Sequence, residues 1–177
     1  MNITRRSVAK WLALAPAASL VPVQAMARSA ARDRADENAY RIRSACSDLS
    51  IRYTHCIADR TFADLDKVFS PDGVLEVQGN RLTGHDAIIQ FLAMSIGTGD
   101  AGVRVRLMIT NELIDVRDER NATGRAFFTI HRFDVTNGPK VPSLAPAAFA
   151  TSDDAYVLTP AGWRMSYRKI NLLAAAA

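Results

Sequence analysis

The sequence has few of the residues that build metal, phosphate and covalent-catalysis sites. It contains three histidines and two cysteines. It has no Gly-rich phosphate loop, no G-x-S-x-G nucleophile motif and no paired cysteines at zinc-binding spacing. The chemistry left to such a chain is that of a pocket without metal or cofactor, so we expect the partner to be a small molecule.

The two cysteines fall on one predicted helix and should not form a disulfide. Ile42, Cys46, Leu49, Tyr53 and Cys56 recur at helical spacing. Ten residues along a helix rise about 15 Å, which is far more than the Cα separation that a disulfide allows. We therefore predict two free, buried thiols.

No hydrophobic run in the sequence is long enough to span a membrane. The run over residues 11–23 is broken by Pro16 and Pro22 and follows the basic residues Arg5-Arg6 and Lys10. A membrane-spanning helix needs roughly 20 apolar residues. A shorter run behind basic residues is typical of a secretory signal peptide.

The residues around Arg5-Arg6 resemble the twin-arginine export signal, and Ala25-Met26-Ala27 places small residues where a signal peptidase cleaves. We therefore expect residues 1–27 to be an export signal peptide. Residues 28–177 are expected to form one periplasmic domain that does not associate with a membrane after cleavage.

Basic and acidic residues are nearly balanced once the predicted signal peptide is set aside. The whole chain has 22 basic and 18 acidic residues. Three of the basic residues lie within residues 1–27, which leaves 19 against 18, a net charge of +1. A nucleic-acid-binding protein needs a concentrated basic surface, so this composition argues against nucleic acid as a partner.

Helical patterns are followed by strand patterns along the chain. After the long helix, apolar spacing predicts a short helix over residues 62–69, a turn at 70–73, a strand at 74–77 and a helix at 87–92. The second half predicts four long antiparallel strands over residues 104–116, 123–135, 148–158 and 163–172. This order is typical of an α+β domain, in which one sheet face packs on helices, and we expect Phe69 and Trp163 to be buried.

The order of these elements resembles the SnoaL-like branch of the nuclear transport factor 2-like superfamily, a branch similar to scytalone dehydratase and hexachlorocyclohexane dehydrochlorinase. The motifs that carry the resemblance are Asp59 near the end of a long helix, Phe69-Ser70-Pro71-Asp72, Gly84 before Ile88-Ile89, Ile109-Thr110-Asn111, and Gly162-Trp163-Arg164 with Arg168. Together they cover residues 36–172. The resemblance implies a cone-shaped fold, with helices on a curved, mainly antiparallel sheet that encloses an apolar pocket, and a homodimer or homotrimer.

The resemblance also implies a site for proton abstraction. In the lyase-like members, an acid at the end of the first helix orients a histidine from the strand that carries the Thr-Asn pair, and this histidine takes a proton from the substrate. Asp59 matches the acid. Met108 stands where the histidine is expected, three residues before Asn111.

Two other histidines are candidates for the missing base. His55 lies one helical turn before Asp59, where the two side chains can meet either at a pocket or in solvent. His131 shares a strand face with Phe127 and Thr129, so it is either catalytic or a packed core or interface residue. We place Asp59, His55 and His131 in the catalytic site, and Met108, Phe127 and Thr129 among the substrate-binding residues.

Three further residues are expected at the substrate site, each with a structural alternative. The Tyr53 hydroxyl either binds a substrate oxygen or satisfies a core carbonyl group. Asn111 either holds a substrate carbonyl group or has a structural role at a strand end. Asp154 either faces the pocket or pairs with Arg168.

Two functions remain open at this point. The first is a cofactor-independent lyase, such as a dehydratase, or an isomerase that abstracts a proton from a small hydrophobic or aromatic molecule. The second is a non-catalytic pocket protein that binds a hydrophobic ligand or a protein partner, with Met108 marking the loss of the base. A histidine nitrogen within about 3.5 Å of the Asp59 carboxylate at a pocket wall, or joined to it through one water, would favour the enzyme. Three histidines in solvent or packed core would favour the binding protein.

Overall fold

The computed structural model describes residues 23–97, 102–136 and 145–175. The chain divides into two compact units, Met1–Ala35 and Asp36–Ala177. In the first unit the described residues belong to the beginning of helix α1 (Val23–Asp59), and the side chains described there are exposed. The expected export motif at Arg5-Arg6 lies outside the described residues. None of the helices in the described ranges carries an apolar stretch that could cross a membrane.

The second part of α1 carries the apolar stripe predicted from the sequence. Ile42, Cys46, Leu49, Tyr53 and Cys56 are all buried. Both cysteines are free thiols, as expected, and burial raises the pKa of the Cys46 thiol to about 12. This stripe forms one wall of the hydrophobic core.

The segment after α1 differs from the prediction. A 3-10 helix, η1 (Phe62–Lys67), replaces the expected α-helix, and strand β1 (Phe69–Val77) begins immediately after Val68. The predicted helix therefore ends too late, and the predicted turn at residues 70–73 is part of a strand. The physical reason is pairing with the end of the chain, because the amide of Met165 donates a hydrogen bond of 2.8 Å to the carbonyl oxygen of Val68.

An irregular register between Phe69 and Val74 absorbs the residues that had suggested a turn. Gly73 is required there because a Cβ atom at this position would lie 2.9 Å from the carbonyl oxygen of Ser70. A local sequence pattern indicated a break in the chain, and only the neighbouring strand shows that the break is a bulge.

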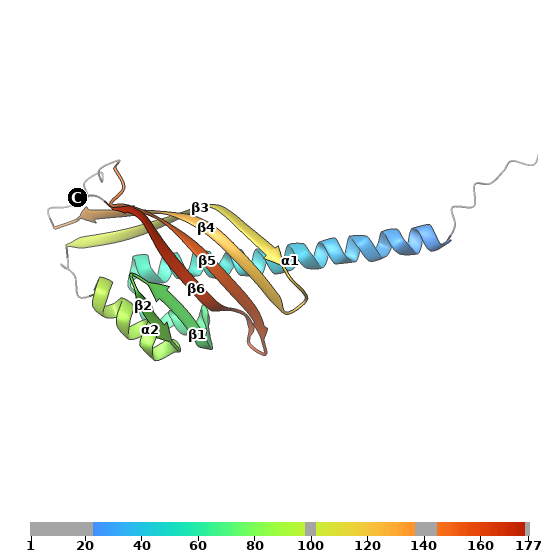
Figure 1. The fold of residues 1–177 in the computed structure, drawn as a ribbon, viewed down its shortest axis with the longest axis horizontal. Helices are drawn as coiled ribbons and strands as arrows, with labels where there is room; N and C mark the ends of the chain where they lie inside the picture. Colours follow the sequence, from blue (N-terminus) through green and yellow to red (C-terminus); the bar gives the residue numbers. More distant parts are fainter. Residues whose placement is uncertain (1–22, 98–101, 137–144, 176–177) are drawn as a thin grey trace, which may run out of the picture. The chain divides into compact units, whose positions relative to one another are not determined.

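Six strands form a single mixed sheet. After β1 come β2 (Asn80–Thr83), helix α2 (His85–Leu92), a short π-helical segment η2 (Ala93–Gly97), β3 (Val103–Val116), β4 (Asn121–Asp134), β5 (Ala148–Thr159) and β6 (Gly162–Ala175). The strand order is β2-β1-β6-β5-β4-β3, and every neighbouring pair is antiparallel except β1 and β6, which are parallel. The four predicted long strands are confirmed, and in Figure 1 they run side by side across α1. The α+β class is therefore confirmed.

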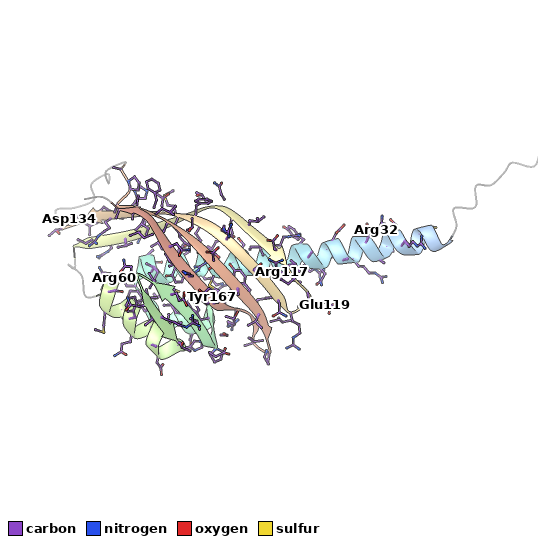
Figure 2. All side chains as sticks on the ribbon, in the orientation of Figure 1. Arg32, Arg60, Arg117, Glu119, Asp134 and Tyr167 are labelled. Atoms are coloured by element: carbon purple, nitrogen blue, oxygen red, sulfur yellow. The ribbon has the colours of Figure 1, made fainter. Side chains whose placement is uncertain are left out.

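Alternation along the strands gives the sheet two distinct faces. The inner face meets α1 and includes Ala126, Phe128 and Ala150, all buried. The outer face includes Phe127 and Tyr167, the second of which is labelled in Figure 2. The Tyr167 hydroxyl donates a hydrogen bond of 2.9 Å to Glu76. Which residues belong to which face decides where a ligand can bind.

The core confirms one of the two expected aromatic anchors. Phe69 has no exposed surface and contacts Tyr53 edge to face, with the ring centroids 6.2 Å apart. Trp163 was expected to be buried as well, but it is only half-buried. It lies at the beginning of β6 and lines a surface cavity with Arg52 and Lys67, so part of its ring stays in contact with water.

Candidate functional site

Asp59 ends α1 beside the first residues of β3, at the edge of the sheet. Its Oδ1 lies 3.8 Å from Nη2 of Arg106, and its Oδ2 lies 3.8 Å from Nδ1 of His55. Arg106 also donates a hydrogen bond of 2.7 Å to the carbonyl oxygen of Ala58. Because the side chains of Asp59 and His55 are 56% and 72% exposed, water surrounds this pair. Asp59 therefore makes solvated contacts with His55 and Arg106, and the second of these links the end of α1 to β3.

His55 borders a cavity of about 330 Å³ whose lining does not include Asp59. The cavity lies between α1 and η1, and its walls include Arg52, Asp64 and Lys67. The last two form an exposed ion pair of 2.6 Å. His55 therefore meets charged surface side chains here.

The candidate residues on β3 and β4 lie on the outer face. Met108 pairs across the strands with Thr129, and His131 pairs with Arg106. Phe127 shares this face, and it is 45% exposed, while Met108 is 55% exposed. The strand face that was expected to line the pocket points away from α1, although the long Arg106 side chain, on the edge strand β3, extends to Asp59 and Ala58 at the end of this helix.

Asn111 has a visible structural role. It has a positive φ of 51° and lies where the register between β3 and β4 shifts, between Thr110 and Leu113. Asparagine tolerates this left-handed backbone better than most residues. The bulge turns Glu112 toward α1, where its carboxylate accepts a hydrogen bond of 2.6 Å from Ser47.

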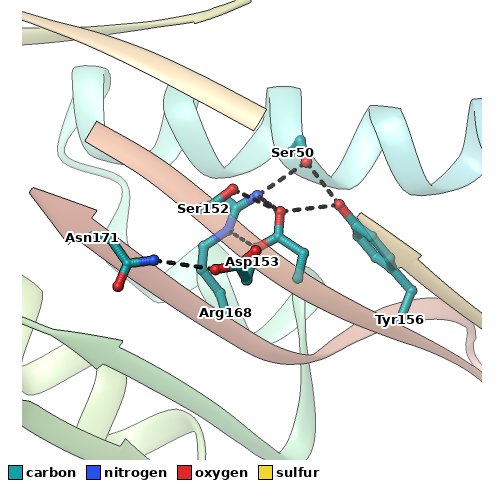
Figure 3. A network of polar contacts seen from close by, with 7 residues as sticks. Ser50, Ser152, Asp153, Tyr156, Arg168 and Asn171 are labelled. Carbon is teal, nitrogen blue, oxygen red and sulfur yellow. Dashed lines mark hydrogen bonds and ion pairs between the residues drawn. The ribbon is translucent and has the colours of Figure 1, made fainter. Parts of the chain in front are cut away.

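A buried polar network joins α1 to β5 and β6 (Figure 3). Arg168 donates from Nε and Nη2 to the two carboxylate oxygens of Asp154, each across 2.8 Å. The Ser152 hydroxyl donates to the same carboxylate across 2.9 Å, and Nη2 of Arg168 also donates to Ser50 Oγ across 3.0 Å. The Tyr156 hydroxyl lies 3.0 Å from Ser50 Oγ and 3.4 Å from Asp154. Of the two alternatives for Asp154, the structure shows the pair with Arg168.

Two aromatic rings flank the guanidinium group. Its carbon lies 4.6 Å from the centroid of the Tyr53 ring and 5.4 Å from that of Phe128. Both contacts are within the range of a cation–π interaction. Tyr53 is 2% exposed, so its ring is part of the core packing around Arg168.

Burial shifts the acid–base behaviour of this cluster. Burial by itself lowers the pKa of Arg168, but the Asp154 carboxylate outweighs it and holds the pKa of this arginine above its ordinary value. Burial also raises the pKa of Tyr53 to about 12 and raises that of Tyr156. At neutral pH the guanidinium is therefore charged and both phenols are protonated.

One buried nitrogen of the cluster lacks a hydrogen-bond partner in the described part of the chain. Nη1 of Arg168 is buried and has no hydrogen-bond partner among the described residues. Arginine carries five N–H donors, and Nη1 holds two of them. An unpaired buried donor is rare in native proteins.

The inner face beside this cluster is apolar. Ala126, Phe128 and Ala150 form a small buried group. The residues that pack against it are half-buried, and they are Leu107, Ile109, Ile130 and Ile170. Arg168 lies buried beside this apolar group, with its guanidinium carbon 5.4 Å from the centroid of the Phe128 ring. We call this set of residues the inner-face site.

The sequence carries a signal for the buried polar cluster on β5 and α1. Ser152, Asp154 and Tyr156 alternate along one strand and so share one face. Ser50 precedes Tyr53 by three residues, which places both on one side of the helix. Polar residues at the positions of a buried face indicate a hydrogen-bonded network, and only the partner elements decide how it closes.

A metal centre has no support in the described part of the chain. Within those residues, no group of three or more histidine, cysteine, aspartate or glutamate side chains is placed to hold an ion.

Solved structures with the same architecture come from several sources. An NTF2-like protein with a cystatin-like fold from Novosphingobium aromaticivorans is 22% identical, covers 84% of this chain and 90% of its own, and has a TM-score of 0.63. A candidate scytalone dehydratase from the same species is 17% identical over 80% of this chain and 90% of its own, with a TM-score of 0.66. LinA is 14% identical, covers 78% of this chain and 90% of its own, and has a TM-score of 0.66. At these identities the similarity shows the fold.

Sequence comparisons place the chain more narrowly. A comparison with curated proteins found no match. The model of the SnoaL-like domain matches residues 39–169, which include all six strands up to Lys169 and the whole buried cluster around Arg168. The chain therefore belongs to the SnoaL-like domain family.

Proposed function

We propose that this protein binds a small, largely apolar molecule at the inner-face site and acts as a binding protein. The observation that carries the proposal is the half-buried apolar surface of Leu107, Ile109, Ile130 and Ile170 on the side of the sheet that meets α1. Covering apolar surface releases roughly 25 cal/mol per Å². A ligand that completes this surface would therefore gain affinity without any catalytic group.

The arrangement around Asp59 favours binding over proton abstraction. A general base works best in a dry site, at hydrogen-bond distance from the proton that it removes. His55 lies 3.8 Å from Asp59 in a solvated contact, and His131 lies on the outer face beside Arg106. Lyase or isomerase activity at Asp59, His55 or His131 stays a prediction, supported by the fold shared with the candidate scytalone dehydratase.

Two further proposals concern where and in what form the protein works. The leader around Arg5-Arg6 supports export to the periplasm. The exposed apolar side chains of Met108, Phe127 and Phe149 on the outer face support association of two or three copies of the chain. We expect binding to need no cofactor.

Binding can be tested with a neutral apolar fluorophore, N-phenyl-1-naphthylamine, titrated into the purified protein. Leu107→Asn places an amide on the inner face, and Leu113→Asn makes the same change on the same strand at a side chain that is 61% exposed. We expect Leu107→Asn to weaken binding roughly tenfold, in line with the loss of apolar burial, and Leu113→Asn to leave it unchanged. Circular dichroism would establish that both variants are folded.

Two results would contradict the proposal. One is the absence of saturable binding by the unmodified protein. The other is an equal loss of affinity in the two variants, because the fluorophore would then report general surface hydrophobicity and not the inner face.

A further inference from the structure

Arg168 is held so that one end of its guanidinium group has no partner. Nε and Nη2 form the edge that faces Asp154, and Nη2 is also bonded to Ser50. Because the guanidinium group is planar and rigid, this geometry directs at least one N–H of Nη1 away from the carboxylate. Nη1 is nevertheless buried and finds no acceptor among the described residues.

The surroundings of Arg168 limit what can satisfy this donor. The rings of Tyr53 and Phe128 lie 4.6 Å and 5.4 Å from the guanidinium carbon and offer only π surface. The next inner-face residue along β6 is Ile170, which pairs with Ser152 on β5, and Ser152 pairs with Ala126 on β4. The Ser152 hydroxyl is bonded to Asp154 and is no partner of Nη1. A hydrogen-bond acceptor for Nη1 must therefore be brought by a water molecule or by a ligand.

The charge of the site selects the kind of acceptor. The Arg168 charge is already matched by the Asp154 carboxylate in a bidentate contact with both side chains at most 1% exposed. A ligand anion would add a second negative charge in a low-dielectric environment, next to Asp154. A neutral carbonyl oxygen accepts the same hydrogen bond without that cost.

We propose that Nη1 of Arg168 donates a hydrogen bond to the carbonyl oxygen of an uncharged, largely apolar ligand whose remaining surface packs on Ile170 and the other half-buried residues of the inner-face site. This inference rests on the proposed function, because it assigns a chemical class to the molecule bound at the inner-face site. Arg168 thereby determines specificity, and the apolar residues provide most of the affinity. Asp154, Ser50 and Ser152 hold the guanidinium group in place.

The test compares two probes that differ only at the carbonyl group. 2-Acetylnaphthalene and 2-ethylnaphthalene have nearly the same shape, and 2-naphthoate adds the anion. We expect the unmodified protein to bind 2-acetylnaphthalene about tenfold or more tightly than 2-ethylnaphthalene, and 2-naphthoate no more tightly than 2-ethylnaphthalene. The carbonyl stretch of bound, carbonyl-labelled 2-acetylnaphthalene should shift to lower frequency.

A matched pair of variants assigns the preference to Arg168. Arg168→Lys keeps the charge beside Asp154 and removes the Nη1 donor. Arg125→Lys makes the same change in the exposed pair between Arg125 and Asp153 on the outer face. We expect Arg168→Lys to lose the preference for the carbonyl probe, measured as the ratio of its affinities for 2-acetylnaphthalene and 2-ethylnaphthalene, while Arg125→Lys keeps the ratio of the unmodified protein.

The outcomes separate this inference from the proposed function. The unmodified protein could bind the acetyl and ethyl probes equally, without a shift in the carbonyl frequency. This result would overturn the hydrogen bond from Arg168 to the ligand carbonyl and indicate a water on Nη1, but it would leave the proposed binding of apolar molecules intact. Tighter binding of 2-naphthoate would overturn the choice of a neutral ligand. Binding of neither neutral probe would overturn the proposed function itself. If Arg168→Lys does not fold, the comparison of probes and the frequency shift in the unmodified protein still decide.

Discussion

The guanidinium group of Arg168 and the carboxylate of Asp154 meet across neighbouring strands through two hydrogen bonds of 2.8 Å, and neither side chain is more than 1% exposed. A buried ion pair contributes little net stability, because both charges have lost their hydration. Removing one partner leaves the other charge unpaired in the core. Variants of this pair therefore measure how strongly the stability of the domain depends on keeping both charges.

Arg168→Met should lower the free energy of unfolding by about 3–5 kcal/mol, because it leaves the Asp154 carboxylate buried without its counter-charge. The double variant Arg168→Met with Asp154→Leu should recover most of this loss. Urea denaturation followed by circular dichroism measures both. Arg125→Met is the matched control in an exposed pair, and it should cost less than about 1 kcal/mol. Equal costs for Arg125→Met and Arg168→Met would contradict the structure.

Alkaline pH should destabilise the domain through its buried phenols. Burial raises the pKa of Tyr53 from 10.0 to about 12, so in the unfolded chain this phenol ionises first. Its stabilising contribution is complete below pH 10 and is lost as the pH rises from 10 toward 12. Tyr53→Phe should reduce this alkaline loss of stability, measured as urea midpoints at pH 8 and 11. An unchanged alkaline loss in Tyr53→Phe would show that another group is responsible, such as Cys46, whose pKa burial also raises.

Asp59→Asn separates the binding protein from the lyase. Because Asp59 lies in a solvated contact with His55 and Arg106, we expect a stability change below about 1 kcal/mol and unchanged affinity for N-phenyl-1-naphthylamine. If the protein has lyase activity that Asp59→Asn lowers by roughly 100-fold without affecting folding, the carboxylate belongs to a catalytic site. His55→Gln and His131→Gln in the same assay would then identify the base.

The outer face should mediate self-association. Thr129 pairs with Met108 on one side and with Phe149 on the other, so two exposed apolar side chains flank it. Phe127→Asp, on the same face, should shift the protein toward monomer in light scattering coupled to size-exclusion chromatography. Ile51→Asp changes an exposed apolar side chain on α1 and should leave the assembly unchanged. A monomeric unmodified protein would remove this proposal.

Export should depend on the paired arginines of the leader. Replacing Arg5-Arg6 with Lys-Lys keeps the charge and removes the guanidinium groups, so secretion should fall sharply and uncleaved chain should accumulate. Mass spectrometry of the exported protein should find Arg28 as its first residue. Normal secretion of the lysine variant would point to the general secretory route.

The sequence by itself determined the elements whose signals are local. The buried stripe from Ile42 to Cys56 follows from helical spacing, and the four long strands follow from composition and turn residues. Phe69, the first residue of β1, fits the helical spacing of Phe62, Leu65 and Val68, so the local pattern predicts a helix there. The pairing that makes it part of a strand comes from Met165, far along the chain. Long-range hydrogen bonds leave no local pattern.

Only the tertiary structure decided which face of each strand is the inner one. On β4, alternate side chains lie on opposite faces of the sheet. One set is Phe127, Thr129 and His131, and the other is Ala126, Phe128 and Ile130. Because both sets are partly apolar, the alternation alone does not show which face meets α1. The choice follows from packing, because the small side chains of Ala126 and Ala150 share the inner face with the large Arg168 side chain, and Phe127 stays outside. The binding site that we propose accordingly lies at Arg168 and its apolar neighbours and not at Met108 and His131.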